Sequence, residues 1–509
     1  MTNMKKRWLC IIPVLCWTPK VFADYKNDIG YGDLQSLLGA GTPSGAGVNV
    51  IQAEASTVLN TDGNFPIYAP DPNHAQFADD TFLFPGTAST SPSSHATGVG
   101  ALFYGSNAMA HGIDTITSYE VNDWISSLYN PNGTVAQPVN GSRIANHSWV
   151  GTGNTPTDTG NILRLVDRQV QLNEFIQVVG VANGTSNNPL LGSAYNVIAV
   201  GRTDGNQDKG SDAVDSVYVA GRTRPDLVAP ETTTSAATPL VSAAAALLVE
   251  TGHNAAATLS NGSTGITGVG TVYNAERSET VKAALMAGAD RATDNSSTTA
   301  NITDYRRNGH ASDNGLDDRF GAGQLNILHS YQIIAGGEQD SLEDGGSGLI
   351  GTSGFDYDAA FGGRQNSNNI ATYTFDATET LNFTASLVWN LGVSNNSNLT
   401  TTLYNLDLEL FDVTTQSTAA SSAGTLDNTE NLWLTLTMGH SYELLVKSAE
   451  SSNFSWDYSL AWYMGAQAAP VPLPAAFYLF ASGLAGLGFT ARRKKPDGSN
   501  IIPLSSTGR

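Results

Sequence analysis

Residues 229–248 read APETTTSAATPLVSAAAALL and predict the central helix of the fold. A Thr/Ser cluster leads into small apolar residues, which is typical of a loop that enters a buried helix. Ser235 would lie at the helix start, where unpaired backbone N–H groups attract a developing negative charge. Pro239 fits an early helical position and Gly252 a C-terminal cap. The stretch therefore predicts either a nucleophilic serine or an Ala-rich core helix that Ser235 merely caps.

The composition is that of a globular protein with long polar loops. Of the 509 residues, 40% are hydrophobic and 14% are charged. This length allows two or three domains with full cores. The formal net charge of −21 repels nucleic acid, and no basic stripe compensates for it. We therefore expect no nucleic-acid partner.

The first 23 residues predict a secretory signal peptide. Lys5, Lys6 and Arg7 precede an apolar run over residues 8–17, and Val21-Phe22-Ala23 fits a cleavage site. Both cysteines of the chain lie inside this segment, so the mature protein would have neither disulfides nor cysteine metal sites. Its removal takes away four positive charges and no acid, which changes the net charge from −21 to −25. An acidic exported protein is expected, for which structural Ca²⁺ is plausible.

Residues 24–337 alternate apolar runs with small-residue helical stretches, which is the pattern of an α/β domain with a mostly parallel sheet flanked by helices. Strands are expected at Val48–Ala53, Arg143–Asn146, Ile176–Ala182 and Val197–Gly201. Helices are expected at Ser94–Phe103, Val121–Leu128, Pro239–Glu250 and Thr280–Ala289. Residues 255–273 are rich in Gly, Ser, Thr and Asn and predict a surface insertion.

Residues 338–354 are rich in Gly, Ser and acidic residues and predict a linker. Over residues 355–465 the period changes to two, as in Leu406, Leu408 and Leu410. Six such runs separated by polar loops predict a β-sandwich accessory domain. Its acidic positions fit a solvated face better than a site.

The segment 470–495 has three parts in order. Val471-Pro472-Leu473-Pro474 is stiff and extended, residues 475–491 are uncharged and largely apolar, and Arg492–Lys495 is a basic stop before a polar tail over 496–509. The apolar part is just long enough for a transmembrane helix, with the basic cluster on the cytoplasmic side. The arrangement resembles the PEP-CTERM sorting tail of exported Gram-negative proteins, and an ordinary C-terminal anchor is the alternative. The resemblance implies processing by an exosortase and a final location in the periplasm, on the cell surface or outside the cell.

Four residues with useful chemistry lie at the edges of expected elements. Glu54 ends the first strand, His95 lies where a Ser-capped helix begins, Asn183 follows a buried strand, and Ser235 begins the helix quoted above. A serine hydroxyl needs a neighbouring base and an anion-stabilising site to attack a carbonyl. We therefore expect the four residues to converge at one edge of a single sheet.

The motifs around these residues resemble those of the subtilisin-like serine proteases, in which the order is acid, His, Ser. The likeness covers residues 24–337 and consists of several short matches in order. These are His95-Ala96-Thr97-Gly98-Val99-Gly100 at the base, Asn146-His147-Ser148-Trp149-Val150-Gly151 along the substrate cleft, Pro225-Asp226-Leu227-Val228-Ala229-Pro230 before the nucleophile, Thr234-Ser235 with Ala237, Pro239 and Val241 around it, and Phe320-Gly321-Ala322-Gly323 at the end of the domain.

The resemblance implies that the protein is a serine endopeptidase acting on protein or peptide substrates, with no cofactor required for the chemistry. Ser235 would attack the scissile carbonyl, His95 would accept its proton, Glu54 would orient His95, and Asn183 would donate to the oxyanion. Four further residues would line the substrate cleft: Ser148, Trp149, Val150 and Gly151.

Several residues depart from the family pattern. Glu54 stands where the family has the shorter Asp, with Gln52 and Asp62 as nearby alternatives. Thr233 adds a side chain where the family has Gly, and Ala96 replaces another Gly. About two dozen residues precede Gly47 after the signal peptide, too few for an inhibitory pro-domain. A catalytically inactive protease fold that serves as a surface or matrix scaffold is therefore the alternative. An esterase is less well supported, because no Gly-x-Ser-x-Gly motif surrounds Ser235.

Overall fold

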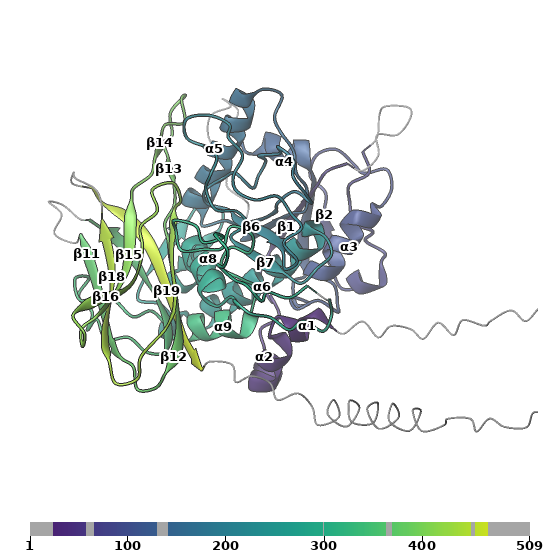
Figure 1. Ribbon diagram of the computed structural model, residues 1–509. Coiled ribbons are helices and arrows are strands. Elements are labelled where there is room, and N and C mark those ends of the chain that lie inside the picture. The colour runs from purple at the N-terminus through teal and green to yellow at the C-terminus, as the bar shows by residue number, and fades with distance from the viewer. Residues whose placement is uncertain are drawn as a thin grey trace, which may run out of the picture. The chain divides into compact units, whose positions relative to one another are not determined.

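The computed structural model describes residues 24–56, 66–129, 141–298, 300–362, 369–448 and 454–466 (Figure 1). The described part of the chain up to Gly465 forms one compact unit, with an α/β part and a β-sandwich. The expected signal peptide and the expected sorting tail over 470–495 both lie outside the described residues.

The α/β part contains a seven-stranded sheet in which every neighbouring pair of strands is parallel. Its strand order is β2-β3-β1-β4-β5-β6-β7. The strands are β1 (Val50–Glu54), β2 (Thr81–Leu83), β3 (Thr115–Glu120), β4 (Ile144–His147), β5 (Ile176–Gly180), β6 (Ile198–Arg202) and β7 (Leu227–Ala229). The four strands predicted from the sequence are confirmed, with shifts of one or two residues at their ends.

Helices cover both faces of this sheet, because its central strands are apolar on both sides. Val50 and Val178 contribute to a core that also contains α3, α6, α8 and α9, whereas Ile51 and Val179 pack with α4 and α5 on the other face. The α-helices are α1 (Tyr25–Asp28), α2 (Tyr31–Leu38), α3 (Ser94–Phe103), α4 (Val121–Ser127), α5 (Pro156–Asn173), α6 (Thr234–Asn254), α7 (Ala256–Leu259), α8 (Ser278–Ala287) and α9 (Ile327–Ala335).

Helix α6 is longer than the sequence predicts. It begins at Thr234, so Pro239 lies in its interior rather than at its start, and Gly252 lies inside the helix rather than capping it. Gly252 packs closely against Ala275, because a Cβ at position 252 would lie 3.1 Å from it. Among the described residues, α6 is the one helix long and apolar enough to cross a membrane, and 83% of its most apolar window is buried inside the protein. It is therefore a core helix of the α/β part.

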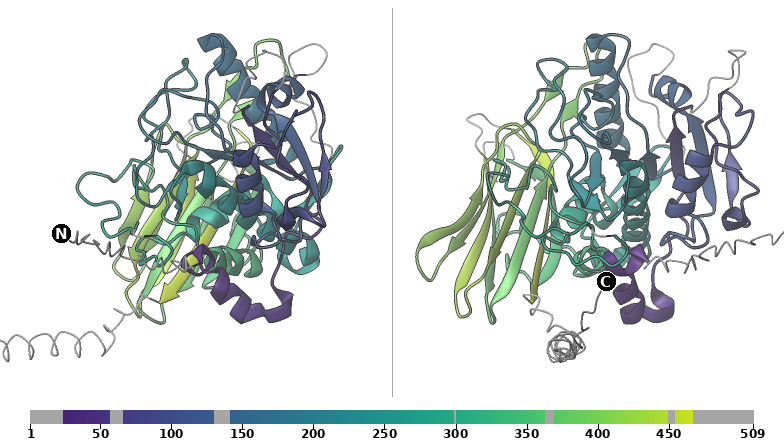
Figure 2. Two further views of the ribbon diagram at one scale, coloured as in Figure 1. Left: turned by 90° about the vertical axis from the view of Figure 1, so that its right-hand side faces the viewer. Right: turned by 45° about the vertical axis from the view of Figure 1, so that its right-hand side comes forward.

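The sandwich consists of two four-stranded sheets, which lie as two layers beside the α/β part (Figure 2). Their orders are β10-β19-β12-β17 and β11-β18-β15-β16, and their apolar faces enclose one core. The strands are β10 (Ser353–Phe361), β11 (Ile370–Asp376), β12 (Leu381–Val388), β15 (Leu406–Asp412), β16 (Ser417–Ser422), β17 (Thr429–Thr435), β18 (Ser441–Ser448) and β19 (Trp456–Ala466). The six predicted runs are confirmed as strands. The additional strands are β10 and β16 of the two sheets and a separate pair, β13 (Gly392–Val393) and β14 (Thr401–Thr402).

The connections at the seam between the two parts are ordered by hydrogen bonds. Residues 255–273, predicted as a surface insertion, contain α7 and a hairpin of β8 (Ser263–Ile266) and β9 (Gly270–Tyr273). The predicted linker 338–354 is held by backbone pairing of Glu338 with Phe355 and of Leu349 with Thr374.

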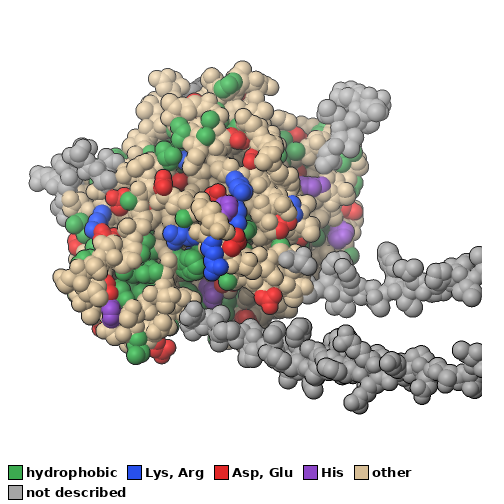
Figure 3. All heavy atoms as spheres, viewed as in Figure 1, with side chains coloured by type: hydrophobic (Ala, Val, Ile, Leu, Met, Phe, Trp, Pro, Cys, Tyr) green, Lys and Arg blue, Asp and Glu red, His purple; other side chains and the backbone are tan. Residues whose placement is uncertain are grey.

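On the face shown in Figure 3, basic side chains lie among acidic ones.

Candidate active site

The carboxyl ends of three neighbouring strands bring the predicted site residues to one edge of the sheet. Glu54 is the last residue of β1, Ser148 directly follows β4, and Asn183 comes three residues after β5. Because β1, β4 and β5 are adjacent and parallel, their carboxyl ends meet at the same edge. This edge is where ligands bind in parallel α/β sheets.

Glu54 and His95 form an ion pair at this edge. Nδ1 of His95 lies 3.1 Å from Oε2 of Glu54. The Glu54 side chain is 1% exposed and that of His95 is 38% exposed, so the imidazole reaches solvent and the carboxylate does not. His95 is the second residue of α3, which Ser93 caps by accepting a hydrogen bond from the backbone N–H of Ala96. The hydrogen bond with Glu54 raises the pKa of His95 above its ordinary value, although partial burial opposes the shift.

Two buried side chains, Gln52 and Tyr104, form a chain of hydrogen bonds that ends at Glu54. The Gln52 amide donates to Oε1 of Glu54 at 2.8 Å and to the carbonyl of Ala96 at 2.9 Å. The hydroxyl of Tyr104 donates in turn to Oε1 of Gln52. Gln52 was an alternative acid-position residue from the sequence, but it supports Glu54 rather than facing His95. The other alternative, Asp62, lies outside the described residues.

Ser235 is the second residue of α6, which Thr233 caps by accepting a hydrogen bond from the backbone N–H of Ala236. The Thr233 side chain therefore caps the start of the helix. Pro239 has no N–H to donate to the Ser235 carbonyl four residues earlier. The Ser148 hydroxyl donates to that carbonyl instead, at 3.0 Å, and the Ser235 hydroxyl donates to the Ser148 carbonyl at 3.3 Å.

Asn183 is connected to the same helix start. Its Oδ1 accepts a hydrogen bond from the backbone N–H of Thr234 at 2.9 Å. No described residue accepts a hydrogen bond from its Nδ2, and Asn183 is exposed, so the amide N–H₂ group can donate to a ligand near the start of α6. A preorganised amide of this kind can stabilise an oxyanion.

The structure does not join the base to the nucleophile directly. Helices α3 and α6 pack against each other, which places their N-terminal turns on the same face of the sheet. Within the described residues, however, no hydrogen bond connects His95 with Ser235, whose hydroxyl is directed to Ser148. The site thus contains the ion pair of Glu54 with His95, and Asn183 bound to the helix start that carries Ser235. A hydrogen bond between His95 and Ser235 is not among the contacts of the described residues.

The predicted substrate strand needs one correction. The Trp149 side chain is only 8% exposed, donates from Nε1 to Nδ1 of His147 at 3.3 Å, and packs in the core between the sheet and α5. It therefore supplies packing instead of an exposed cleft wall. Val150 is 39% exposed, and Gly151 pairs with Leu190 through two backbone hydrogen bonds of 3.2 and 3.0 Å. Substrate binding along 148–151 stays a prediction.

His147 is a histidine of this region that the sequence motifs did not single out. It ends β4 and is completely buried between Trp124 and Trp149. Burial lowers the pKa of His147 to about 3, so its imidazole is neutral wherever His95 titrates. Of the two histidines at this edge, His95 is the one that can exchange protons with solvent.

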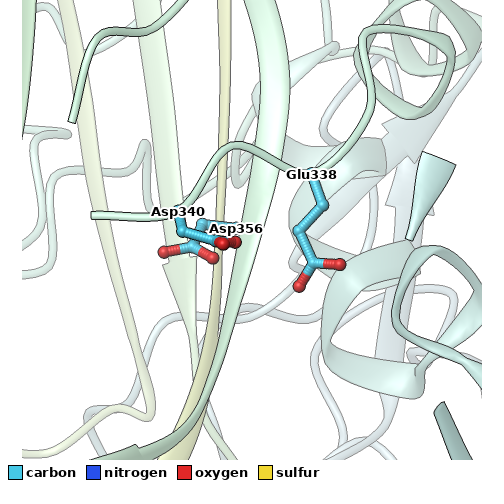
Figure 4. Close-up of side chains that lie close together, drawn as sticks. All are labelled: Glu338, Asp340 and Asp356. Carbon is cyan, nitrogen blue, oxygen red and sulfur yellow. The ribbon is translucent and has the colours of Figure 1, made fainter. Parts of the chain in front are cut away.

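One group of carboxylates in the described residues has the spacing of a cation site. Glu338, Asp340 and Asp356 each offer an oxygen, and these oxygens lie within 4.8 Å of one another (Figure 4). Glu338 and Asp340 come from the segment predicted as a linker, and Asp356 is buried in β10. Amides of Asn261 and Asn274 already donate to the first two. The set fits the oxygen ligands that Ca²⁺ prefers, and calcium binding stays a prediction.

No family model matches this chain, and no curated protein matches it. Among solved structures, the PatG macrocyclase in complex with peptide is 13% identical, with a TM-score of 0.36 over 59% of this chain and 94% of that one. The pre-peptidase C-terminal domain of collagenase from Bacillus anthracis is 19% identical, with a TM-score of 0.17 over 22% of this chain and 91% of that one. PliG from Aeromonas hydrophila, a periplasmic inhibitor of g-type lysozyme, is 14% identical, with a TM-score of 0.16 over 23% of this chain and 93% of that one. Identity and TM-score are low in each case, and the function of this chain is therefore argued from its own residues.

Proposed function

We propose that the protein is an exported serine endopeptidase of the subtilisin-like kind, which hydrolyses peptide bonds through an acyl-enzyme. Ser235 is the nucleophile and His95 the general base. Glu54 orients His95 and stabilises its protonated form, and Asn183 donates a hydrogen bond to the oxyanion. The observation that carries the proposal is the 3.1 Å Glu54–His95 pair at the sheet edge where Ser235 and Asn183 also lie.

In the proposed reaction, substrate binding releases the Ser235 hydroxyl from the Ser148 carbonyl and turns it toward His95. His95 then accepts the hydroxyl proton as Ser235 attacks the scissile carbonyl, and Glu54 stabilises the resulting imidazolium. The Asn183 amide donates to the tetrahedral oxyanion, a contribution of about 3 kcal/mol for a side chain in this role. His95 returns the proton to the leaving amine, and water repeats the sequence to release the acyl group.

A fluorophosphonate probe tests the nucleophile. The wild-type protein should become covalently labelled, because an activated serine attacks phosphorus as it attacks a carbonyl. Ser235→Ala should abolish labelling, and Ser242→Ala is the matched control, since Ser242 lies two turns further along α6 and is buried. Absence of labelling in folded wild-type protein would refute the proposal.

One observation favours a second candidate, a catalytically inactive scaffold with a protease fold. Ser235 donates to the Ser148 carbonyl and not to His95 in the free protein. If this hydrogen bond persists when a peptide is bound, the hydroxyl is not activated. The scaffold predicts a folded wild-type protein that neither reacts with the probe nor cleaves casein, with or without the substitution at Ser235.

The location and partners are proposals of the same kind. The signal peptide over 1–23 and the tail over 470–495 support export across the inner membrane of a Gram-negative bacterium, membrane retention through the tail and release by an exosortase. The substrate is a protein or peptide, and nucleic acid is not a partner. The proposed chemistry uses no cofactor. Any bound Ca²⁺ would have a structural role.

A further inference from the structure

Gln52 connects both members of the acid–His pair. It lies on the same face of β1 as Glu54, because side chains two residues apart in a strand point the same way. Its single N–H₂ group donates to Oε1 of Glu54 and to the carbonyl of Ala96, the residue after His95. One amide therefore fixes the carboxylate relative to the helical turn that carries the imidazole.

Tyr104 fixes the orientation of that amide. Its completely buried hydroxyl donates to Oε1 of Gln52, so the N–H₂ end of the amide must face Glu54. With the amide rotated by half a turn, Oε1 would face the Glu54 carboxylate and two acceptors would oppose each other. Gly100 makes room for Tyr104, because a Cβ at position 100 would collide with the hydroxyl.

A carboxylate as buried as that of Glu54 needs hydrogen bonds in place of the water that it loses. The Gln52 amide donates to Oε1, whereas Oε2 lies 3.1 Å from Nδ1 of His95 and accepts no hydrogen bond from any other described residue. Without the amide, Oε1 of Glu54 would have no donor and the carboxylate would no longer be fixed toward His95. The chain of hydrogen bonds thus determines the position of Glu54 relative to His95.

We propose that Gln52 and Tyr104 are positioning residues that hold Glu54 and His95 as one unit and allow a glutamate to occupy the acid position. The inference rests on the proposed function only where it concerns turnover, because the hydrogen-bond chain is a property of the folded protein.

The test is an NMR titration of the protein with ¹⁵N-labelled imidazoles, in which His95→Ala identifies one of the eight histidines. The variants are Gln52→Met, which keeps the side-chain length and loses the donor, and Tyr104→Phe, which loses one oxygen. Tyr31→Phe is the matched control, since Tyr31 is equally buried and donates to the Met109 carbonyl. Gln177→Met is the control for a buried amide on a nearby strand.

Both test variants should lower the pKa of His95, and neither control should change it. The kcat/KM of Gln52→Met and of Tyr104→Phe on a peptide substrate should fall by roughly 10- to 100-fold, because the catalytic pair is misplaced. An unchanged pKa of His95 in folded Tyr104→Phe would overturn the inference. This variant decides the test by itself if Gln52→Met does not fold. A lowered pKa in a protein that never cleaves peptide would leave the positioning role intact and refute the proposed function alone.

Discussion

At the scale of single residues, the most informative feature is a glutamate next to the imidazole. Glu54 is one methylene longer than aspartate, and its carboxylate is divided between two partners, Gln52 on one oxygen and His95 on the other. Both partners lie on fixed elements, β1 and the first turn of α3. The longer side chain is therefore held at both oxygens and is not free to move.

The charge of Glu54 should be visible in the pH dependence of turnover. The pKa of His95 is raised chiefly by its hydrogen bond with Glu54, and only the neutral imidazole accepts the serine proton. The acid limb of kcat/KM in the wild-type protein should therefore lie above pH 6.5, the ordinary pKa of histidine. Glu54→Gln should move the limb to lower pH and reduce the plateau by about 10⁴-fold.

Peptide hydrolysis measured from pH 5 to pH 9 checks this prediction. Asp412→Asn is the control, since Asp412 pairs with His440 in the sandwich at 2.7 Å. It should leave the profile unchanged. An acid limb at the same pH in wild type and Glu54→Gln would mean that Glu54 is not the partner of the titrating group.

Some of the elements that carry the candidate site could be predicted from the sequence, but their supporting contacts could not. The motif around His95 indicates the correct start of α3 and Glu54 lies at the predicted strand end, whereas the helix expected from Pro239 begins five residues earlier, at Thr234. Tyr104 lies fifty-two positions from Gln52, and no local pattern indicates that they meet. Trp149 was expected in a cleft, because a motif gives the strand but not the side on which a large side chain finds packing.

At the scale of elements, α6 combines a buried core helix with a proline in its interior. Pro239 removes one backbone hydrogen bond and frees the carbonyl of Ser235, which Ser148 then uses. The irregularity lies one turn from the proposed nucleophile. The missing Pro239 hydrogen bond therefore lowers the stability of the helix. In exchange, the free Ser235 carbonyl accepts a hydrogen bond from Ser148, which connects the helix start to the end of β4.

Pro239→Ala should separate these two effects. Alanine restores an N–H that competes with Ser148 for the Ser235 carbonyl, so the free energy of unfolding should rise by about 1–3 kcal/mol while kcat falls. Urea unfolding and peptide hydrolysis measure the two quantities. Pro156→Ala is the control, because Pro156 is at the first position of α5, where no hydrogen bond is lost. Equal or higher kcat in Pro239→Ala would contradict the role given to the irregularity.

The elements that the sequence did not predict have physical reasons for being missed. Strand β7 has three residues, too few for a period to be visible. Strand β10 buries Asp356 and Asp358 beside Phe355 and Tyr357, so apolar and polar residues do not separate by face. It was therefore assigned partly to a linker. By contrast, α3 has a serine cap and apolar spacing, and its predicted bounds are correct.

At the scale of the whole molecule, the two parts share buried polar contacts. Every residue of α8 is buried, and the helix packs against β12 of the sandwich. Thr280 on α8 bonds to Ser459 on β19, and Asn390 donates to Glu279. At the same seam, Arg277 pairs with Glu174 at 2.6 Å and stacks over the ring of Tyr357 in β10. The sandwich is therefore integral to the folded unit.

Breaking this seam should destabilise both parts together. Arg277→Met removes the cation that pairs with the buried Glu174 carboxylate and leaves it only the hydrogen bonds from Ser278, so the free energy of unfolding should fall by about 3–5 kcal/mol. Calorimetry should give one unfolding transition for wild type and variant, at a lower temperature in the variant. Lys447→Met, which removes a more exposed pair with Glu409, should cost at most about 1 kcal/mol. Two separate transitions in the wild type would mean that the parts fold independently.

The small side chains of helix α6 would matter if the chain is exported as we propose. By length and composition alone this helix could cross a membrane. If the chain is exported, this segment must move through the secretion channel unfolded without partitioning sideways into lipid. Alanine, which dominates residues 243–246, is much less lipophilic than leucine. In an exported chain, a core helix built from small side chains would therefore also limit partitioning into lipid.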